Sequence, residues 1–274
     1  MAEKRQETSN NYVEVKVSRF FLKSCAMVFV LAAGCFAQDW NGFYVGANAG
    51  GVKGSSNAFT NTIFSPTGYF ALSSVPAIAA TGNQLLSPRG FTGGGTGGYN
   101  FQHGHWVLGF EGDFGVMRAH DKFTAGPTLY PCCAPTSFTI TQSGSSDWLF
   151  TVRPRIGYGT PHVLVYGTTG VAITNLNYKE DFIDTFATAH EFASTSGTLF
   201  GWTGGGGVEF KIGSGHHWSL KGEYLWVDFG TGLQTTSTNL TAFGPPAIPF
   251  PTNVFTHRID LTTQIFRSGF NYRF

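Results

Sequence analysis

Charged side chains are scarce in this sequence, and this limits the kinds of protein that it can be. Asp, Glu, Lys and Arg make up 12% of its 274 residues, roughly half the share that is usual for soluble domains. Aromatic residues reach 16%, glycines number 37, and the mean hydropathy is nevertheless close to zero, at -0.02. Such a composition is unusual for a cytoplasmic protein, while the length is ample for a large core.

Long apolar runs are also missing, apart from one near the start. Basic residues precede an apolar core over about 25–33, which is too short to span a bilayer as a helix because spanning takes roughly 20 residues. A basic flank, a short apolar core and then small residues predict a cleaved secretory signal over 1–37 and a mature chain over 38–274. Two alternatives stay open, namely a lipoprotein signal in which Cys35 is acylated and a translation start placed too far upstream.

The mature chain has neither a strong net charge nor a framework of cysteines. Without residues 1–37 the net charge is near -1, whereas a nucleic-acid partner would need a basic patch. Cys25 and Cys35 belong to the predicted signal, so only the adjacent Cys132 and Cys133 remain. In an oxidising compartment this pair forms either a strained ring or a bridge to another chain. Zinc binding would need two more ligands nearby, and the sequence offers none.

Aromatic, β-branched and glycine residues recur along the mature chain in eight segments of about ten to sixteen residues. Most segments alternate in polarity, which predicts β-strands. None has the i, i+3, i+4 spacing of a helix long enough to matter, so we expect an all-β protein. The segments are 40–51, 90–101, 106–117, 148–158, 163–173, 199–210, 218–229 and 259–274.

The connections between these segments alternate strictly between long and short. Every long connection exceeds the length of about fifteen residues above which loops are uncommon in compact soluble domains. Short periplasmic turns, long extracellular loops and strands of about ten residues are typical of an outer-membrane barrel. We therefore predict an eight-stranded antiparallel up-and-down transmembrane β-barrel. The long connections are 55–88, 120–146, 175–197 and 230–257, and the short ones are 102–105, 159–162 and 211–216.

Several predicted strands carry their charges on one face and their aromatic residues on the other. In lipid, the apolar face of a barrel points outward and the charged face lines the lumen, whereas a soluble barrel reverses this arrangement. Opposite charges fall at similar depths, so they can pair in a narrow interior where an unpaired charge costs on the order of several kcal/mol. The alternative is that they are scattered over a solvated face. The predicted lumen charge network is Glu111, Asp113, Arg153, Arg155, Lys221, Glu223 and Arg267.

Two further kinds of residue have a predicted place in this barrel. Trp40, Trp106, Trp148 and Trp218 stand at strand ends, where the two membrane interfaces accommodate an apolar ring with a polar N–H; the alternative is that they are ordinary core residues. Pro154 falls within a strand of a barrel that has no free edge, so we expect either a bulge or a local defect there.

The last predicted strand carries aromatic residues at alternate positions, Phe270, Tyr272 and Phe274. It resembles the signal by which the barrel-assembly machinery recognises its substrates. Together, the stretches WNGFYVGANAGG, YLWVDFG and GFNYRF resemble the outer-membrane immunogenic, porin-like surface proteins, which are small eight-stranded barrels of the OmpA/OmpX-like group. The resemblance covers about 40–274, without the loops. It implies a Gram-negative surface antigen with an envelope-structural or adhesive role and no catalytic residues, and some relatives are associated with hemin.

An eight-stranded barrel is just wide enough for side chains to fill it, so we expect no open pore. The leading hypothesis is a non-enzymatic, monomeric outer-membrane surface protein with an envelope-structural or antigenic role. Its expected partners are outer-membrane lipid, lipopolysaccharide and the barrel-assembly machinery, with no cofactor, metal or nucleic acid. The alternatives are a loop-mediated binder of hemin or a host molecule, with His120, His190 and His257 as loop ligands, and a soluble periplasmic barrel that carries an apolar ligand.

The loops and two motifs bear on the choice between these hypotheses. The loops are rich in Phe, Ile and Pro, so they either contact another surface or pack on one another as a lid. The glycine-rich stretch 93–98 formally matches a dinucleotide-binding fingerprint, but no helix or acidic partner follows it. His217 and Ser219 are similar to the His/Ser pair of outer-membrane lipid deacylases, but they fall at a predicted periplasmic turn without an orienting acid.

Overall fold

The computed structural model describes residues 40–213, 217–230 and 232–274. The signal predicted over 1–37, with Cys25 and Cys35, lies outside the described residues. No helix in the described ranges is long and apolar enough to cross a membrane. The elements are β1 (Gly42–Thr62), α1 (Ser74–Thr81), β2 (Asn83–Leu86), β3 (Arg89–His103), β4 (Trp106–Leu129), β5 (Ser137–Gly159), β6 (Val163–Asp184), β7 (His190–Ile212), β8 (Trp218–Asp228), β9 (Leu233–Ser237), β10 (Thr241–Ala242), β11 (Ile248–Pro249), β12 (Phe255–Ile259) and β13 (Thr262–Arg273).

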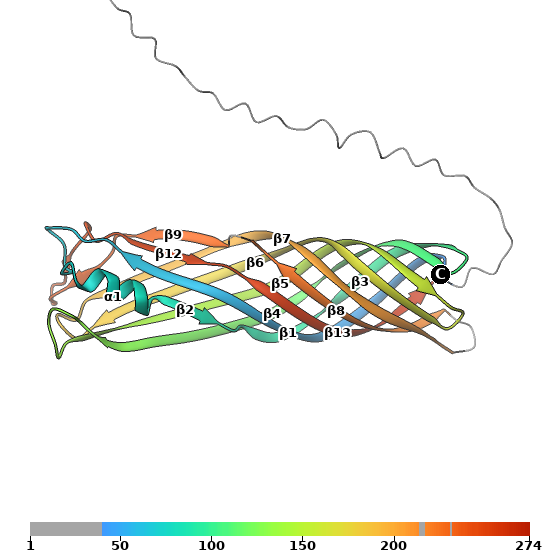
Figure 1. Cartoon of the computed structure of the whole chain (residues 1–274), viewed down its shortest axis with the longest axis horizontal. Coiled ribbons are helices and arrows are strands. Elements are labelled where there is room, and N and C mark those ends of the chain that lie inside the picture. Colours follow the sequence, from blue (N-terminus) through green and yellow to red (C-terminus); the bar gives the residue numbers. More distant parts are fainter. Residues whose placement is uncertain (1–39, 214–216, 231) are drawn as a thin grey trace, which may run out of the picture. The chain divides into compact units, whose positions relative to one another are not determined.

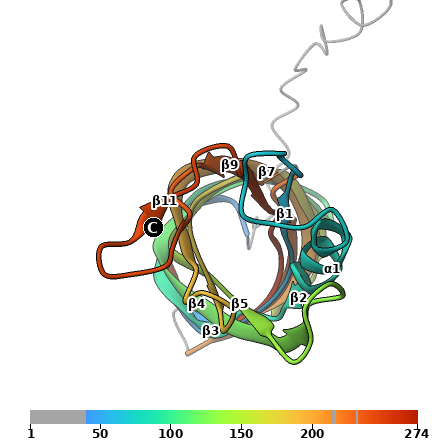
Figure 2. The same cartoon turned by 90° about the vertical axis from the view of Figure 1, so that its left-hand side faces the viewer.

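Eight strands pair in an antiparallel ring, which confirms the predicted barrel, and Figures 1 and 2 show the closed wall. The ring runs through β1, β3, β4, β5, β6, β7, β8 and β13, and β13 returns to pair with β1. The predicted short connections 102–105 and 159–162 are tight turns at one end, which we call the inner end, and β7 ends and β8 begins at this same end. The long connections, with α1 and the short strands, lie at the opposite, outer end.

Outward-facing residues form an apolar band around the inner half of the barrel. Along β4 the exposed side chains are those of Trp106, Leu108, Phe110, Phe114 and Val116, and each inward neighbour is buried or half-buried. A length of about eleven residues per strand suits a tilted strand that crosses a bilayer. The band covers 43–51, 91–101, 106–116, 148–158, 163–173, 200–212, 218–226 and 266–274. The next outward residues are polar: Lys53, Arg89, Arg118, Asp147, Asn175, Thr198, Asp228 and Gln264.

Five strands continue far beyond this band, so much of what the sequence predicts as loop is strand. For example, β5 begins at Ser137, and its outer half buries Phe138, Ile140 and Gln142 on alternate positions. The outward positions there are Thr and Ser rather than aromatic residues, so the pattern on which the prediction rests is missing. The predicted loops that become strand are 55–62, 120–129, 137–146, 175–184 and 190–197.

Pro154 faces outward in β5 and causes a local defect rather than a bulge. It stays in register with Phe110 on one side. On the other side the ladder with β6 lacks the pairs of Arg153 and Pro154 and resumes, in unchanged register, at Arg155 and Thr168. The Thr168 hydroxyl donates a hydrogen bond of 2.9 Å to the Pro154 carbonyl. The missing N–H of proline therefore interrupts the ladder without displacing the strand.

The outer wall is completed by the short elements. Beyond the ends of β8 and β13, β9 and β12 pair with each other, and β12 also pairs with β1. On the other flank of β1, β2 continues in the register of β3. The short helix α1, where we expected no helix long enough to matter, contributes Ile78 to the core beneath the loops. Among the described strands β9 pairs only with β12, so no backbone ladder joins it to β7.

Inward-facing side chains fill the lumen in successive layers. The first layer at the inner end is an inner cluster, and the charged residues lie next to it. An apolar middle core comes third and a small polar cluster fourth. The last layer, under the outer loops, is a lid core. The inner cluster is Trp40, Val107, Leu164 and Tyr166. The middle core includes Val52, Met117, Leu149, Leu225 and Ile265. The lid core is Phe70, Ile78, Tyr130, Phe138, Ile140, Phe182, Ala189, Leu240, Ala242 and Phe255.

Candidate functional site

The seven residues of the predicted lumen charge network all point into the barrel at the depth of the apolar band. Each is at most 5% exposed. Arg153 on β5 lies among three carboxylates: its guanidinium nitrogens are 2.6 Å from Glu111, 2.8 Å from Asp113 and 3.2 Å from Glu223. One cation thus joins β4, on which Glu111 and Asp113 lie, to β8, which carries Glu223.

The remaining cations complete the network from neighbouring strands. Arg267 on β13 contacts Asp113 at 2.8 Å and Glu223 at 2.6 Å. Lys221 lies 3.0 Å from Glu111. Every one of these groups is buried beside a group of opposite charge, which is the condition under which buried ions are tolerated.

Glu209 on β7 is a member of the network that we did not predict. It is buried, and its carboxylate accepts a hydrogen bond of 2.7 Å from Arg155. With Glu209 the network holds four carboxylates and four cations, so its formal charge is zero. The sequence contains a signal that could have predicted its inward direction, because it is the neighbour of the outward-facing Phe210. It also pairs with Lys221 on β8.

Neutral polar groups add further hydrogen bonds to the carboxylates of this network. The hydroxyl of Tyr44 donates to Glu111 at 2.8 Å, and that of Tyr166 donates to Glu223 at 2.8 Å. The guanidinium of Arg155 lies over both tyrosine rings, 4.5 Å and 5.1 Å from their centroids. The inner half of the lumen is therefore closed by charges that are engaged with one another.

Three of the four predicted interface tryptophans lie on the outer surface, and the fourth does not. Trp106 and Trp218 are more than half exposed at the inner edge of the band, while Trp148 is half-buried at its outer edge. The prediction for Trp40 is wrong, because its ring is only 1% exposed. Its indole N–H donates to the carbonyl of Thr160 at 2.7 Å, across the inner opening. Trp40 precedes β1, so the alternation of a strand does not fix the direction of its side chain.

The terminal aromatic residues line the outside of β13. Phe270 and Phe274 are exposed and Tyr272 is half-buried. The Tyr272 ring packs edge-on against Trp218, with centroids 5.0 Å apart, and against Phe274 at 5.3 Å. The rings of Trp218, Tyr272 and Phe274 therefore form one continuous surface beside the strand that closes the barrel.

The three histidines predicted as loop ligands all lie on strands, and the structure does not bring them together. His120 on β4 and His190 on β7 are exposed on the outer wall, and His190 Nε2 is 2.6 Å from Asp181. His257 on β12 instead points into the lumen and is fully buried. A ligand outside the barrel therefore cannot bind all three histidines. The sequence did not reveal this, because a residue in a predicted loop has no predicted side-chain direction.

His257 faces two buried glutamates that we did not predict. Its Nδ1 lies 3.7 Å from Glu180 on β6, and its Nε2 lies 3.5 Å from Glu191 on β7. Burial, reinforced by the negative charge of Glu191, raises the pKa of Glu180 to about 11. Burial also opposes the ionisation of Glu191, but contacts with His257, Glu180 and Ser237 hold its pKa below the usual value. Both glutamates lie in a stretch that we predicted as loop, so the alternation that would have placed them inside was not visible.

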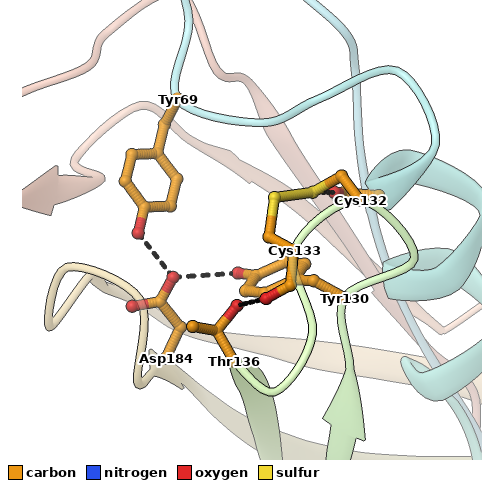
Figure 3. Close-up of a disulfide and its surroundings, with 7 residues drawn as sticks. Tyr69, Tyr130, Cys132, Cys133, Thr136 and Asp184 are labelled. Atoms are coloured by element: carbon orange, nitrogen blue, oxygen red, sulfur yellow. Dashed lines mark hydrogen bonds between the residues drawn. A yellow bond between two sulfur atoms is a disulfide. The ribbon is translucent and has the colours of Figure 1, made fainter.

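Cys132 and Cys133 are joined to each other at the outer end, one of the two states that the sequence left open (Figure 3). The Cys133 carbonyl accepts a short hydrogen bond from the Thr136 hydroxyl. The disulfide lines a cavity of about 130 Å³ together with aromatic side chains of the lid. The lining residues are Tyr69, Phe70, Ala71, Ser74, Tyr130, Cys132, Cys133 and Phe186.

Asp184, at the outer end of β6, ties two of the outer loops together. The hydroxyls of Tyr69 and Tyr130 both donate to Asp184 Oδ2, at 2.6 Å and 3.0 Å (Figure 3). Burial, with the adjacent Asp184 carboxylate, raises the pKa of both phenols well above their usual value. The roots of the loops are thus packed as a lid, while apolar side chains at the tips stay exposed. These exposed side chains are Ile63, Phe64, Leu72, Phe186, Phe243 and Ile248.

Known proteins resemble this chain in sequence. A family model described as "Outer membrane protein beta-barrel domain" matches residues 24–274. The 31 kDa outer-membrane immunogenic protein of Brucella melitensis is 31% identical over 194 residues, which cover 70% of this chain and 72% of the relative. The 22 kDa outer membrane protein of Rhizobium leguminosarum is 31% identical over 140 residues, or 51% of this chain and 53% of that protein. The structure of outer membrane protein OprG from Pseudomonas aeruginosa covers 85% of this chain and 97% of its own, with 12% identity and a TM-score of 0.38.

Proposed function

The chain belongs to the outer-membrane β-barrel domain family, and from this we propose that it is a non-enzymatic surface protein with an envelope-structural and antigenic role. It is a protein of the Gram-negative outer membrane, as its family and named relatives are. The barrel is a rigid transmembrane domain, and the lid is a folded surface that faces the exterior. The word "immunogenic" in the name of the Brucella relative supports the antigenic part of the proposal.

The observation that carries the proposal is the filled lumen. The eight charged side chains at its inner half, which together are neutral, contact one another across the barrel, and apolar layers lie on both sides of them. A solute would have to break several buried ion pairs to pass, which is costly. Each carboxylate of this network faces a cation, so the network holds no acid or base that is free to act on a substrate.

The exposed apolar tips of the lid support a contact with another surface as part of the same role. Phe64, Leu72 and Phe243 are each more than two fifths exposed, and apolar side chains at such tips favour binding to a partner. Lipopolysaccharide and host surfaces are the partners that we propose for them. We also propose that the protein is a monomer and that the barrel-assembly machinery recognises Phe270, Tyr272 and Phe274.

A conductance measurement on the purified protein tests the closed lumen. After reconstitution into planar bilayers, we expect no steady channel activity, and liposomes that contain the protein should not swell in sugar solutions. Antibodies raised against a lid peptide should label intact cells, whereas antibodies against the inner turns should need permeabilised cells. A stable open channel in most insertions would contradict the structural role and turn the proposal into one of transport.

A further inference from the structure

We propose that Glu180, Glu191 and His257 bind one divalent transition-metal ion in the outer half of the lumen, and that Zn²⁺ is a suitable probe for it. The three side chains come from β6, β7 and β12, and each is at most 2% exposed. One oxygen of each carboxylate and one ring nitrogen lie within 4.8 Å of one another. The cluster is separate from the lumen charge network, because the apolar middle core lies between them.

The chemistry of the donor set fits such an ion. Zinc is bound by histidine nitrogen and carboxylate oxygen at about 2.0–2.2 Å, and imidazole ligands generally select first-row transition metals. Two ligands of a tetrahedral ion at such distances are about 3.4 Å apart. Donor atoms that already lie within 4.8 Å of one another would therefore have to approach by roughly 1 Å, which side-chain rotations can supply. Three protein ligands leave a fourth position for a water molecule or a nearby hydroxyl.

Unpartnered oxygen atoms point to a missing ligand. Neither carboxylate oxygen of Glu180 has a hydrogen-bond partner, although the side chain is buried, and one oxygen of Glu191 is also unpartnered. The amide oxygen of Gln142, directly opposite Glu180 in the ladder between β5 and β6, lacks a partner too. Such orphaned buried acceptors are rare in folded proteins. A cation among them would satisfy the carboxylates and offset their charge.

The imidazole is oriented as a ligand usually is. The hydroxyl of Thr60 lies 3.1 Å from Nδ1, and that of Ser237 lies 3.4 Å from Nε2. Whichever nitrogen binds the ion, the other one has a hydroxyl partner that can fix the tautomer. Thr60 is itself held, because it accepts a hydrogen bond of 3.0 Å from Gln142 Nε2. Ser237 also donates a short hydrogen bond to Glu191.

The position of the cluster gives the ion a structural role. Glu191 lies on β7, whereas His257 belongs to the β9–β12 pair, and no backbone ladder joins β9 to β7 in the described part of the wall. Side chains bridge this seam instead, among them Ser237, which donates to Glu191, and Asn239, which donates to the Phe192 carbonyl at 2.7 Å. A metal ion held by both sides would close the outer wall at this seam.

Zinc titration of the refolded, untagged protein tests this inference. The chain is refolded in detergent with EDTA, freed of chelator, and then refolded again with increasing Zn²⁺, because the lid core encloses the site. Uptake is measured by competition with a chromogenic chelator and by elemental analysis after gel filtration. We expect one zinc per chain. His257→Ala and the nearly isosteric Glu180→Gln should each weaken binding by more than about 100-fold, since even loss of an outer-shell partner costs up to that factor.

His120→Ala is the matched control, because it removes an exposed histidine of the outer wall and should leave binding unchanged. The heat-dependent shift on SDS gels shows for each variant that the barrel has formed. If His257→Ala does not fold, zinc binding by Glu180→Gln alone decides whether the cluster is the site. Absence of zinc in folded wild-type protein would overturn the inference, as would equal uptake by the wild type and both site variants. The inference can fail while the lumen stays closed, so its outcome is distinct from that of the proposed function.

Discussion

Replacement of Arg153 by methionine should destabilise the barrel more than any exposed substitution of the same kind. The guanidinium has three carboxylate partners within 3.2 Å, so its removal leaves four buried carboxylates with three cations. Loss of one partner from a buried ion pair costs about 3–5 kcal/mol, because the remaining charge is uncompensated. We expect a loss of that size in the free energy of unfolding, measured by urea titration in lipid vesicles with tryptophan fluorescence.

The double variant Arg153→Met with Glu223→Gln distinguishes charge balance from packing. It restores a neutral network of three carboxylates and three cations, so it should regain about 2 kcal/mol relative to the single variant. Arg118→Met, at an exposed position just outside the apolar band, is the control and should change stability by less than about 0.5 kcal/mol. A double variant that is no more stable than Arg153→Met alone would refute the idea that the network is held together by mutual neutralisation.

Three further predictions concern the two ends of the barrel. Phe274→Ala should reduce the fraction that reaches the heat-modifiable form in cells, while it leaves refolding of the purified protein in detergent unchanged. Trp40→Ala should cost about 3–5 kcal/mol because it empties a buried site, whereas Trp218→Ala, at the exposed surface, should cost clearly less. The raised pKa values of Tyr69 and Tyr130 mean that the unfolded state loses these protons first, so the lid should lose stability as the pH rises above about 10.

Each of these has a defined contrary result. Normal assembly of Phe274→Ala in cells would remove the terminal ring from the proposed recognition signal. Equal costs for the two tryptophan variants would mean that the inner cluster does not close the barrel. Ionisation of Tyr69 and Tyr130 with an ordinary midpoint near pH 10, without any loss of lid structure, would contradict the buried hydrogen bonds to Asp184. The variant Asp184→Asn serves as the comparison.

The sequence predicts the membrane band and its lumen well because one physical rule governs both. Side chains that face lipid must be apolar, so Phe110 and Phe266 point outward. Because neighbouring side chains on a strand point to opposite faces, Glu111 and Arg267 must point inward. Outside the band this rule stops. The outward positions there are in contact with water, so they can be threonine or serine instead of aromatic residues. In the sequence, the strands that carry Glu180 and Glu191 therefore look the same as loops.

Other features depend on contacts that no local pattern encodes. Trp40 lies across the inner opening because Thr160, far away in the chain, offers a carbonyl there. His257 looks like a loop residue in the sequence, yet its strand is aligned by β1, nearly two hundred residues earlier, through the pair of His257 with Thr60. Long-range pairing of this kind is visible only once the ring has closed.

The length of the strands determines what a large molecule outside the cell can reach. β1 continues for eleven residues beyond the last position of the band. At about 3.3 Å per residue and a tilt of about 40°, the wall rises about 28 Å above the hydrocarbon. The sides of this wall would lie among the sugars of the surrounding glycolipid, with which its threonines and asparagines can form hydrogen bonds. An antibody that approaches from the medium would then reach only the outer end of the barrel, so the outer loops, with the paired cysteines among them, form nearly the whole of the face that the cell displays.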